Sequence, residues 1–370
     1  MNRRFRLTLA FALSLALVGG LVLSLVSGSG APGARTANTS QGEEFLGIAQ
    51  GSRLDTEDLQ TMTATGVRVD RLLLSWDFAQ PSEGSFRWPD LLVGSLAADG
   101  IEAVPFVWAS PSWLTGVRER PPVGSRRAEH AWRHFLKAAV KRYGPGGSYW
   151  ADVYHRQFGA SATPVPIQSW EIWNEPNLDN YFAPKPSVSR YARLLRIAHD
   201  AIKSQDPHAQ IVLAGITAYG HPQAWKFLDQ LYRVPGAKGD FDVAALNPYA
   251  SNLRQVRGVI ERFHAVMRKH GDEKTPLWIT ELGWGSAPPD RFGLNRGIRG
   301  QAKMLAGSFK LILDHRRAWN VKRLFWFDWR DPGRTEQAGA CSFCGSAGLL
   351  KHNRDPKPAY KAFKRFARAN

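Results

Sequence analysis

The two stretches VRVDRLLL at residues 67–74 and IEAVPFVW at residues 101–108 decide the fold. Each is a short, mostly apolar run of the length expected for a strand in a covered parallel sheet. Between them, residues 89–98 repeat their apolar side chains with the 3.6-residue period of a helix, and Gly100 follows as a stop signal. A strand, a helix and a second strand in this order predict a parallel βαβ unit.

The same alternation continues along the chain and gives eight pairs. The predicted strands cover residues 45–49, 67–74, 101–108, 167–173, 210–216, 241–246, 277–280 and 323–327. The predicted helices cover residues 55–65, 89–98, 126–143, 187–204, 222–232, 253–269, 297–317 and a closing stretch within 351–370. Eight pairs predict a (β/α)8 TIM barrel, an α/β fold that forms one domain over residues 43–370. The alternative is an open doubly wound sheet, but no G-x-G-x-x-G or G-x-x-x-x-G-K-[ST] turn follows the first strand, which argues against nucleotide binding.

The amino terminus carries an export signal. Three arginines, Arg3, Arg4 and Arg6, precede an apolar run at residues 7–26, and small residues follow it. This pattern predicts either a cleaved signal peptide or a retained signal anchor within residues 1–34. Residues 35–42 are rich in small and polar side chains and are expected to be a flexible linker. We therefore expect a secreted or extracytoplasmic protein, with residues 7–26 as a possible membrane tether.

The charge balance raises the question of an acidic partner. The chain has 49 Lys and Arg against 32 Asp and Glu, a formal net charge of +17. Nucleic acid, anionic lipid and acidic polysaccharide would all respond to this charge. Part of it lies in residues 351–370, where the apolar spacing favours an amphipathic helix with a solvated basic face. For an exported chain we expect no nucleic-acid partner.

The cysteines and histidines do not form a metal site in the sequence. Cys341 and Cys344 are the only cysteines, and two ligands in a Gly- and Ser-rich loop are too few for a zinc site. For an exported chain, a small loop-closing disulfide is the favoured interpretation. His130 and His134 share a helix face but have no carboxylate helper at a suitable spacing. We therefore expect no metal and no cofactor.

Two glutamates lie where strands are predicted to end. Glu175 belongs to the sequence WNEPN at residues 173–177, after the fourth strand, and Glu281 belongs to TELGW at residues 280–284, after the seventh. In a barrel, the carboxyl ends of all strands meet at the face where active sites lie. Removing a carboxylate from water is costly, so two of them at one face indicate a chemical role.

These two motifs resemble the acid/base and nucleophile motifs of the retaining (β/α)8-barrel glycoside hydrolases of clan A. The similarity is strongest to family 39 and its β-xylosidase-like members, with family 5 as a neighbour. It implies that Glu175 is the general acid and base and that Glu281 is the nucleophile. The chemistry makes the same demand, because glycoside cleavage needs one carboxyl group to protonate the leaving oxygen and another to stabilise or attack the sugar carbon.

The resemblance also implies roles for five further residues. Asn174 would bond the sugar 2-hydroxyl, Arg71 would hold the nucleophile ionised, and Tyr249 would donate a hydrogen bond to it. Trp326 would form the floor of the subsite beside the scissile bond, and Trp284 is a second, weaker aromatic candidate. One departure stands out, because relatives usually carry His where this chain has Asn247.

Three functions remain open from the sequence. The leading one is an exported retaining glycosidase that cleaves the O-glycosidic bonds of a polysaccharide or oligosaccharide. The second is a carbohydrate-binding barrel with weak or no turnover, which the departure at Asn247 favours. The third is a membrane-tethered, envelope-binding module that uses its basic surface.

Overall fold

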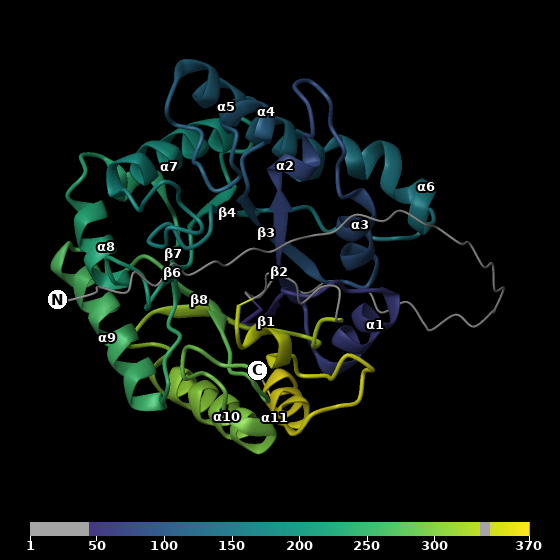
Figure 1. Cartoon of the computed structure of the whole chain (residues 1–370). Helices are drawn as coiled ribbons and strands as arrows, with labels where there is room; N and C mark the ends of the chain where they lie inside the picture. The colour runs from purple at the N-terminus through teal and green to yellow at the C-terminus, as the bar shows by residue number, and fades with distance from the viewer. Residues whose placement is uncertain (1–43, 334–340, 370) are drawn as a thin grey trace.

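The computed structural model describes residues 44–333 and 341–369 and shows a sheet rolled into a barrel inside a ring of helices (Figure 1). Its strands are all parallel and follow the order β5-β4-β3-β2-β1-β9-β8-β7-β6. They span β1 Leu46–Ala49, β2 Val69–Ser75, β3 Glu102–Trp108, β4 Ser169–Ile172, β5 Gln210–Leu213, β6 Ile216–Thr217, β7 Ala244–Asn247, β8 Leu277–Leu282 and β9 Val321–Trp326. The predicted TIM barrel is confirmed.

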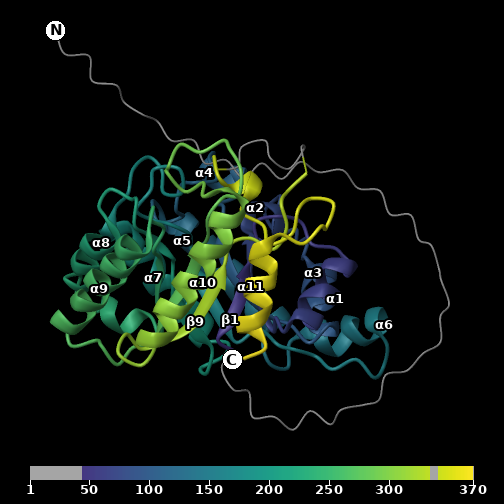
Figure 2. The same cartoon turned by 90° about the horizontal axis from the view of Figure 1, so that it is seen from below.

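The helices surround the barrel. They span α1 Thr56–Thr65, α2 Trp76–Ala79, α3 Asp90–Ala98, α4 Ser112–Thr115, α5 Arg126–Tyr143, α6 His155–Phe158, α7 Val188–Lys203, α8 Ala224–Tyr232, α9 Leu253–Lys269, α10 Gly297–His315 and α11 Pro358–Ala367. The long helices begin at the caps that the sequence offers; the side chains of Ser125, Ser187 and Asn252 each accept a hydrogen bond from the first turn that follows. The last helix, α11, packs beside α10 (Figures 1 and 2).

The barrel closes in two places. The first strand β1 pairs with the last strand β9, so the two ends of the chain meet in one sheet. On the other side, the predicted single strand 210–216 is interrupted and forms β5 and β6, with Val212 pairing with Val243 beside β7. The interruption falls at Gly215, whose N–H donates to Glu171 Oε1 at 2.9 Å instead of to a neighbouring strand. The prediction of an uninterrupted strand was therefore wrong at this position.

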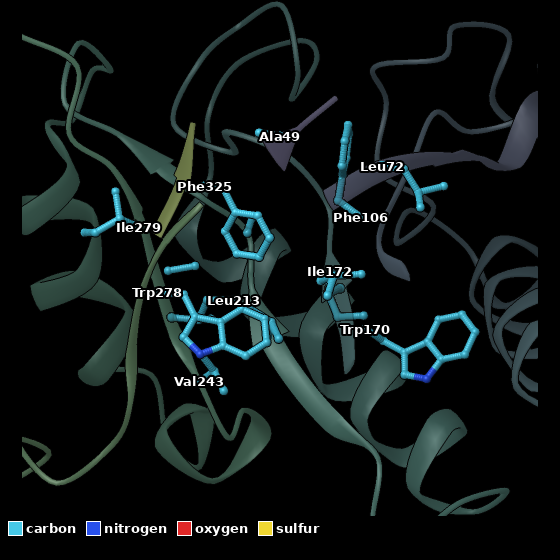
Figure 3. Close-up of a cluster of buried hydrophobic side chains, with 14 of the residues drawn as sticks. Ala49, Leu72, Phe106, Trp170, Ile172, Leu213, Val243, Trp278, Ile279 and Phe325 are labelled. Carbon is cyan, nitrogen blue, oxygen red and sulfur yellow. The ribbon is translucent and has the colours of Figure 1, made fainter. Parts of the chain in front are cut away.

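Large apolar side chains fill the barrel and the layer between strands and helices (Figure 3). Inside, Phe325 of β9 lies beside Trp278 of β8, with ring centroids 6.2 Å apart. A Cβ atom on Gly47 would lie 2.7 Å from the Phe325 ring, so β1 needs a glycine there. An ion pair between Arg323 of β9 and Glu102 of β3 joins two strands that are not neighbours, with a closest contact of 2.8 Å.

The amino-terminal predictions lie outside the described residues: the signal or anchor at 1–34 and the linker at 35–42. In the part that the structure does describe, no helix combines the length and the apolar character needed to cross a bilayer. Cys341 and Cys344 are joined by a disulfide, with their Cα atoms 5.2 Å apart.

Candidate active site

Arg71 lies at the centre of a hydrogen-bond network near the carboxyl-terminal face of the barrel. It projects from β2 and is 1% exposed. Its Nε donates to Glu171 Oε2 at 2.6 Å and its Nη2 donates to Glu171 Oε1 at 2.7 Å, so β4 and β2 are joined by a bidentate ion pair. The same guanidinium donates through Nη1 to Glu281 Oε1 at 2.7 Å and through Nη2 to Asn174 Oδ1 at 2.8 Å. One buried cation thus orients three side chains from two parts of the chain, the end of β4 and strand β8.

Glu175 sits on a strained turn after β4. Trp173 and Glu175 both have positive φ angles, of 78° and 38°, which non-glycine residues adopt at a cost of about 1–3 kcal/mol each. Surrounding contacts hold the turn in place. The indole of Trp173 donates to the carbonyl of Tyr181 at 2.6 Å, and the buried amide of Asn177 donates to the carbonyl of Thr217 at 2.8 Å. The fold therefore fixes the Glu175 carboxyl group in one place.

Asn247 connects Glu175 with the strand that carries Glu281. It is fully buried at the end of β7, and its Nδ2 donates to Glu175 Oε1 at 3.1 Å. Its Oδ1 accepts a hydrogen bond from the Thr280 hydroxyl at 2.8 Å, which fixes the direction of the amide. A Cβ atom on Gly215 would lie 2.4 Å from both Asn247 Oδ1 and Thr280 Oγ1, so this network requires glycine at the break between β5 and β6.

Glu281 lies inside strand β8 rather than after it, one residue before its end. Besides Arg71, it is bonded by the Tyr249 hydroxyl, which donates to Glu281 Oε2 at 3.0 Å. The Tyr249 ring is supported by Phe343, from the loop that the disulfide closes, with ring centroids 5.4 Å apart. The side chain of Glu281 stays 13% exposed, so it is fixed by two donors and still open to a ligand.

The surroundings of Glu175 raise its pKa. Burial, and then the nearby negative charge of Glu281, raise the pKa of Glu175 from 4.5 to about 8. Hydrogen bonds from Asn247 and Thr217 and the charge of Arg71 oppose this rise. Glu175 is consequently a neutral proton donor at pH 7, beside a carboxylate that accepts hydrogen bonds from a cation and a phenol. A buried acid beside a hydrogen-bonded carboxyl group is the arrangement that acid-assisted displacement at a sugar carbon needs.

The structure brings five of the seven predicted site residues together: Arg71, Asn174, Glu175, Tyr249 and Glu281. It does not bring Trp326 and Trp284 there. Both indoles are fully buried; Trp326 packs against Phe309 of α10, and the Trp284 N–H donates to the carbonyl of Ala250. For Trp326 the physical reason is strand alternation: Phe325 faces the barrel interior, so its neighbour Trp326 faces the helices.

Three residues at the site were not predicted from the sequence. Glu171 pairs with Arg71, and Thr280 orients Asn247. Gly215 leaves room for the side chains of Asn247 and Thr280. A signal was present for one of them, because Arg71 and Glu171 are opposite charges inside two apolar strands. Across residues 44–333 and 341–369, no group of three or more His, Cys, Asp and Glu side chains is arranged to hold a metal ion.

Comparison with known proteins agrees with the barrel. No family model matches the chain. A curated beta-xylosidase from Geobacillus stearothermophilus is 24% identical, over 53% of this chain and 41% of that protein, so the chain spans less than half the length of this relative. A family 39 glycoside hydrolase structure from Bacteroides cellulosilyticus WH2 has a TM-score of 0.65 at 21% identity, covering 87% of this chain and 63% of that one.

A second solved structure, a monomeric beta-xylosidase from Caulobacter crescentus CB15, has a TM-score of 0.62 at 16% identity and covers 89% of this chain and 68% of its own. At identities this low the likeness concerns the fold. The chain has the (β/α)8 barrel fold that these two structures also have.

Proposed function

We propose that this protein is a retaining glycoside hydrolase that cleaves O-glycosidic bonds in a polysaccharide or oligosaccharide. The observation that supports it most is the pairing of a buried Glu175, protonated at pH 7, with Glu281, which Arg71 and Tyr249 hold by hydrogen bonds. The names of relatives with the same barrel, beta-xylosidases among them, make β-xylosides the first substrates to test.

In the proposed mechanism, Glu281 attacks the anomeric carbon while Glu175 protonates the leaving oxygen, which gives a glycosyl-enzyme intermediate and a free alcohol. Glu175, now a carboxylate, then takes a proton from water, and the oxygen of that water displaces Glu281 from the sugar. Arg71 orients Glu281 by a hydrogen bond, and Asn174, fixed by the same guanidinium, is positioned to contact the sugar beside Glu175.

We further propose that the enzyme works outside the cytoplasm, either secreted or held at the membrane through residues 7–26. The arginines and the apolar run at the amino terminus support this location. Cell fractionation with mass measurement of the mature amino terminus distinguishes a cleaved signal from a retained anchor.

The proposed function is tested with aryl glycosides, beginning with aryl β-xylosides. Proton NMR of the first product should show the same anomeric configuration as the substrate. A 2-deoxy-2-fluoro glycoside with a good leaving group should label the enzyme, and peptide mass spectrometry should find the label on Glu281. A product of inverted configuration would contradict the retaining mechanism, and absence of turnover with every glycoside, together with sugar binding, would favour the carbohydrate-binding alternative.

The pH dependence follows from the state of Glu175. Because its pKa is raised to about 8 and the proton is needed for leaving-group departure, kcat/KM should stay high up to that pH and then fall, approaching about tenfold per pH unit. Initial rates with an aryl glycoside between pH 4 and pH 10 measure this limb. A decline centred near pH 5 would contradict a raised pKa of Glu175.

Asn247 sets the position of that limb. Its amide hydrogen bond favours the ionised form of Glu175, so an Asn247→Ala variant should have a higher Glu175 pKa, with the alkaline limb moved upward by about half to one pH unit. Thr280→Val keeps the Asn247 amide but removes the hydrogen bond that orients it, so it should move the alkaline limb in the same direction by a smaller amount than Asn247→Ala does. A downward shift in either variant would contradict this role.

A further inference from the structure

A basic groove lies on the outer face of helix α9, away from the two glutamates. It consists of two adjoining shallow hollows that are open to solvent, of about 540 and 550 Å³, which share Gly258, Glu261 and Arg262. The first hollow extends over Arg254 and Arg257, and the second continues to Arg268 and Trp319. In Figure 1, α9 belongs to the outer ring of helices, so this face is on the surface of the molecule.

The groove carries an excess of positive charge. Four arginines and one glutamate line it, and the glutamate already pairs with Arg257 at 2.7 Å. Within the part of the chain that the structure describes, no carboxylate pairs with Arg254, Arg262 or Arg268. The Arg262 guanidinium lies over the Trp225 ring, 4.4 Å from its centroid, which keeps the side chain in place while its N–H groups remain available.

A glycine keeps the floor of the groove open. Gly258 lies in the middle of α9, where glycine lowers helix stability by about 1 kcal/mol relative to alanine. Packing does not demand it, because an added Cβ would meet only the Arg262 guanidinium, at an ordinary 3.5 Å. Gly258 lines both hollows, so a larger side chain at this position would reduce the space that they share.

The groove runs along α9, from Arg254 near the start of the helix to Arg268 near its end. Helix α9 begins at Leu253, four residues after Tyr249, whose hydroxyl donates to Glu281. The Arg254 end thus lies at the carboxyl-terminal face of the barrel, and the other end reaches Trp319, just before β9 begins. At about 1.5 Å per residue, Arg254 and Arg268 are roughly 20 Å apart along the helix, so the charges follow one line leading away from the site.

We propose that this groove, lined by Arg254, Arg262 and Arg268 over Gly258, binds an acidic polysaccharide, a chain of uronate sugars, along the outer face of α9. Planar guanidinium groups match carboxylates bidentately, and an extended polyanion presents them in series. A membrane fits less well, because binding to lipid needs exposed apolar side chains, and the large exposed apolar residues are Phe78, Leu91, Val117, Tyr219 and Ile298, none on α9. The assignment of this polymer as a substrate rests on the proposed glycosidase function, whereas its binding to the groove does not.

The test is binding of the full chain to polygalacturonate, by affinity electrophoresis and calorimetry, at low and physiological salt. An Arg254→Gln/Arg262→Gln/Arg268→Gln variant should bind about tenfold or more weakly. The matched control removes three exposed charges from α11 and its C-cap, as Lys361→Gln/Arg365→Gln/Arg368→Gln, and should change binding by less than about threefold. Gly258→Leu changes no charge and favours the helix, and it should weaken binding by filling the groove.

The outcomes are distinct. Equal losses in the two triple variants would show a general charge effect and overturn the groove, as would full binding by Gly258→Leu. Binding to anionic vesicles but not to polygalacturonate would also overturn it, whereas weak binding to the methyl-esterified polymer would support recognition of the carboxylates. The groove variants should keep wild-type kcat/KM on a small aryl glycoside; if the wild type turns over no glycoside but binds polygalacturonate, the glycosidase proposal fails and the groove stands.

Discussion

A Glu281→Gln variant should lose on the order of 10⁴-fold in kcat on an activated aryl glycoside while still binding carbohydrate. Glutamine keeps the shape of the side chain; its one oxygen can still accept a hydrogen bond from Arg71, and its NH2 group can donate to the Tyr249 hydroxyl, but a neutral amide cannot form the glycosyl ester. The loss should therefore appear in kcat and not in the free energy of unfolding. Steady-state kinetics and thermal unfolding of the same preparation separate the two effects.

The matched control is Glu83→Gln, which makes the same chemical change at a surface ion pair with Arg127, 63% exposed on both sides. It should leave kcat unchanged. A smaller variant, Glu281→Ala, leaves space for an external anion, so azide should restore part of the activity and yield a glycosyl azide of inverted configuration. If Glu281→Gln kept more than about a tenth of the wild-type rate, another group would have to be the nucleophile.

An Arg71→Met variant should have the largest effect on stability. Methionine has similar length and fits an apolar wall, but its introduction leaves Glu171, with no solvent exposure, as a buried charge without its cation. Breaking a buried pair in this way lowers the free energy of unfolding by about 3–5 kcal/mol. Turnover should fall as well, because Arg71 also orients Glu281 and Asn174. Urea unfolding and aryl glycoside kinetics measure the two losses.

Two further variants show whether charge is the cause. Arg127→Met removes an arginine whose partner Glu83 is equally exposed, so stability should change by less than about 1 kcal/mol. The double variant Arg71→Met/Glu171→Gln removes both charges of the buried pair and should recover a substantial part of the lost stability but not the activity. If the double variant were as unstable as Arg71→Met alone, lost packing rather than an unpaired carboxylate would explain the effect.

Periodicity alone predicted the fold, because eight strand and helix pairs leave few arrangements that bury both faces of a parallel sheet. The pair of glutamates was also predictable, since carboxylates that end apolar strands meet at one face. The position of Trp326 was not, because the side-chain direction in a strand has a period of two, and a shift of one residue moves the indole from the interior to the helix layer.

The supporting network could be predicted only in part. Arg71 and Glu171 are about one hundred residues apart in sequence, and the pairing of β2 with β3 and β3 with β4 is what brings them together. The role of Asn247, at the end of β7, depends on Thr280 in β8 and on the absence of a side chain at Gly215, between β5 and β6. Such contacts follow from strand register, which local sequence patterns do not specify.

The pairing of β1 with β9 also affects when the barrel can close during synthesis of the chain. Leu46 and Leu324 face each other in the sheet, so a growing polypeptide cannot close its cylinder until almost all of it has been synthesised. Until then the curved sheet has two bare edges that can join other chains, and bringing such distant segments together is slow. A partly synthesised chain is therefore more open to edge-to-edge association than the closed barrel is.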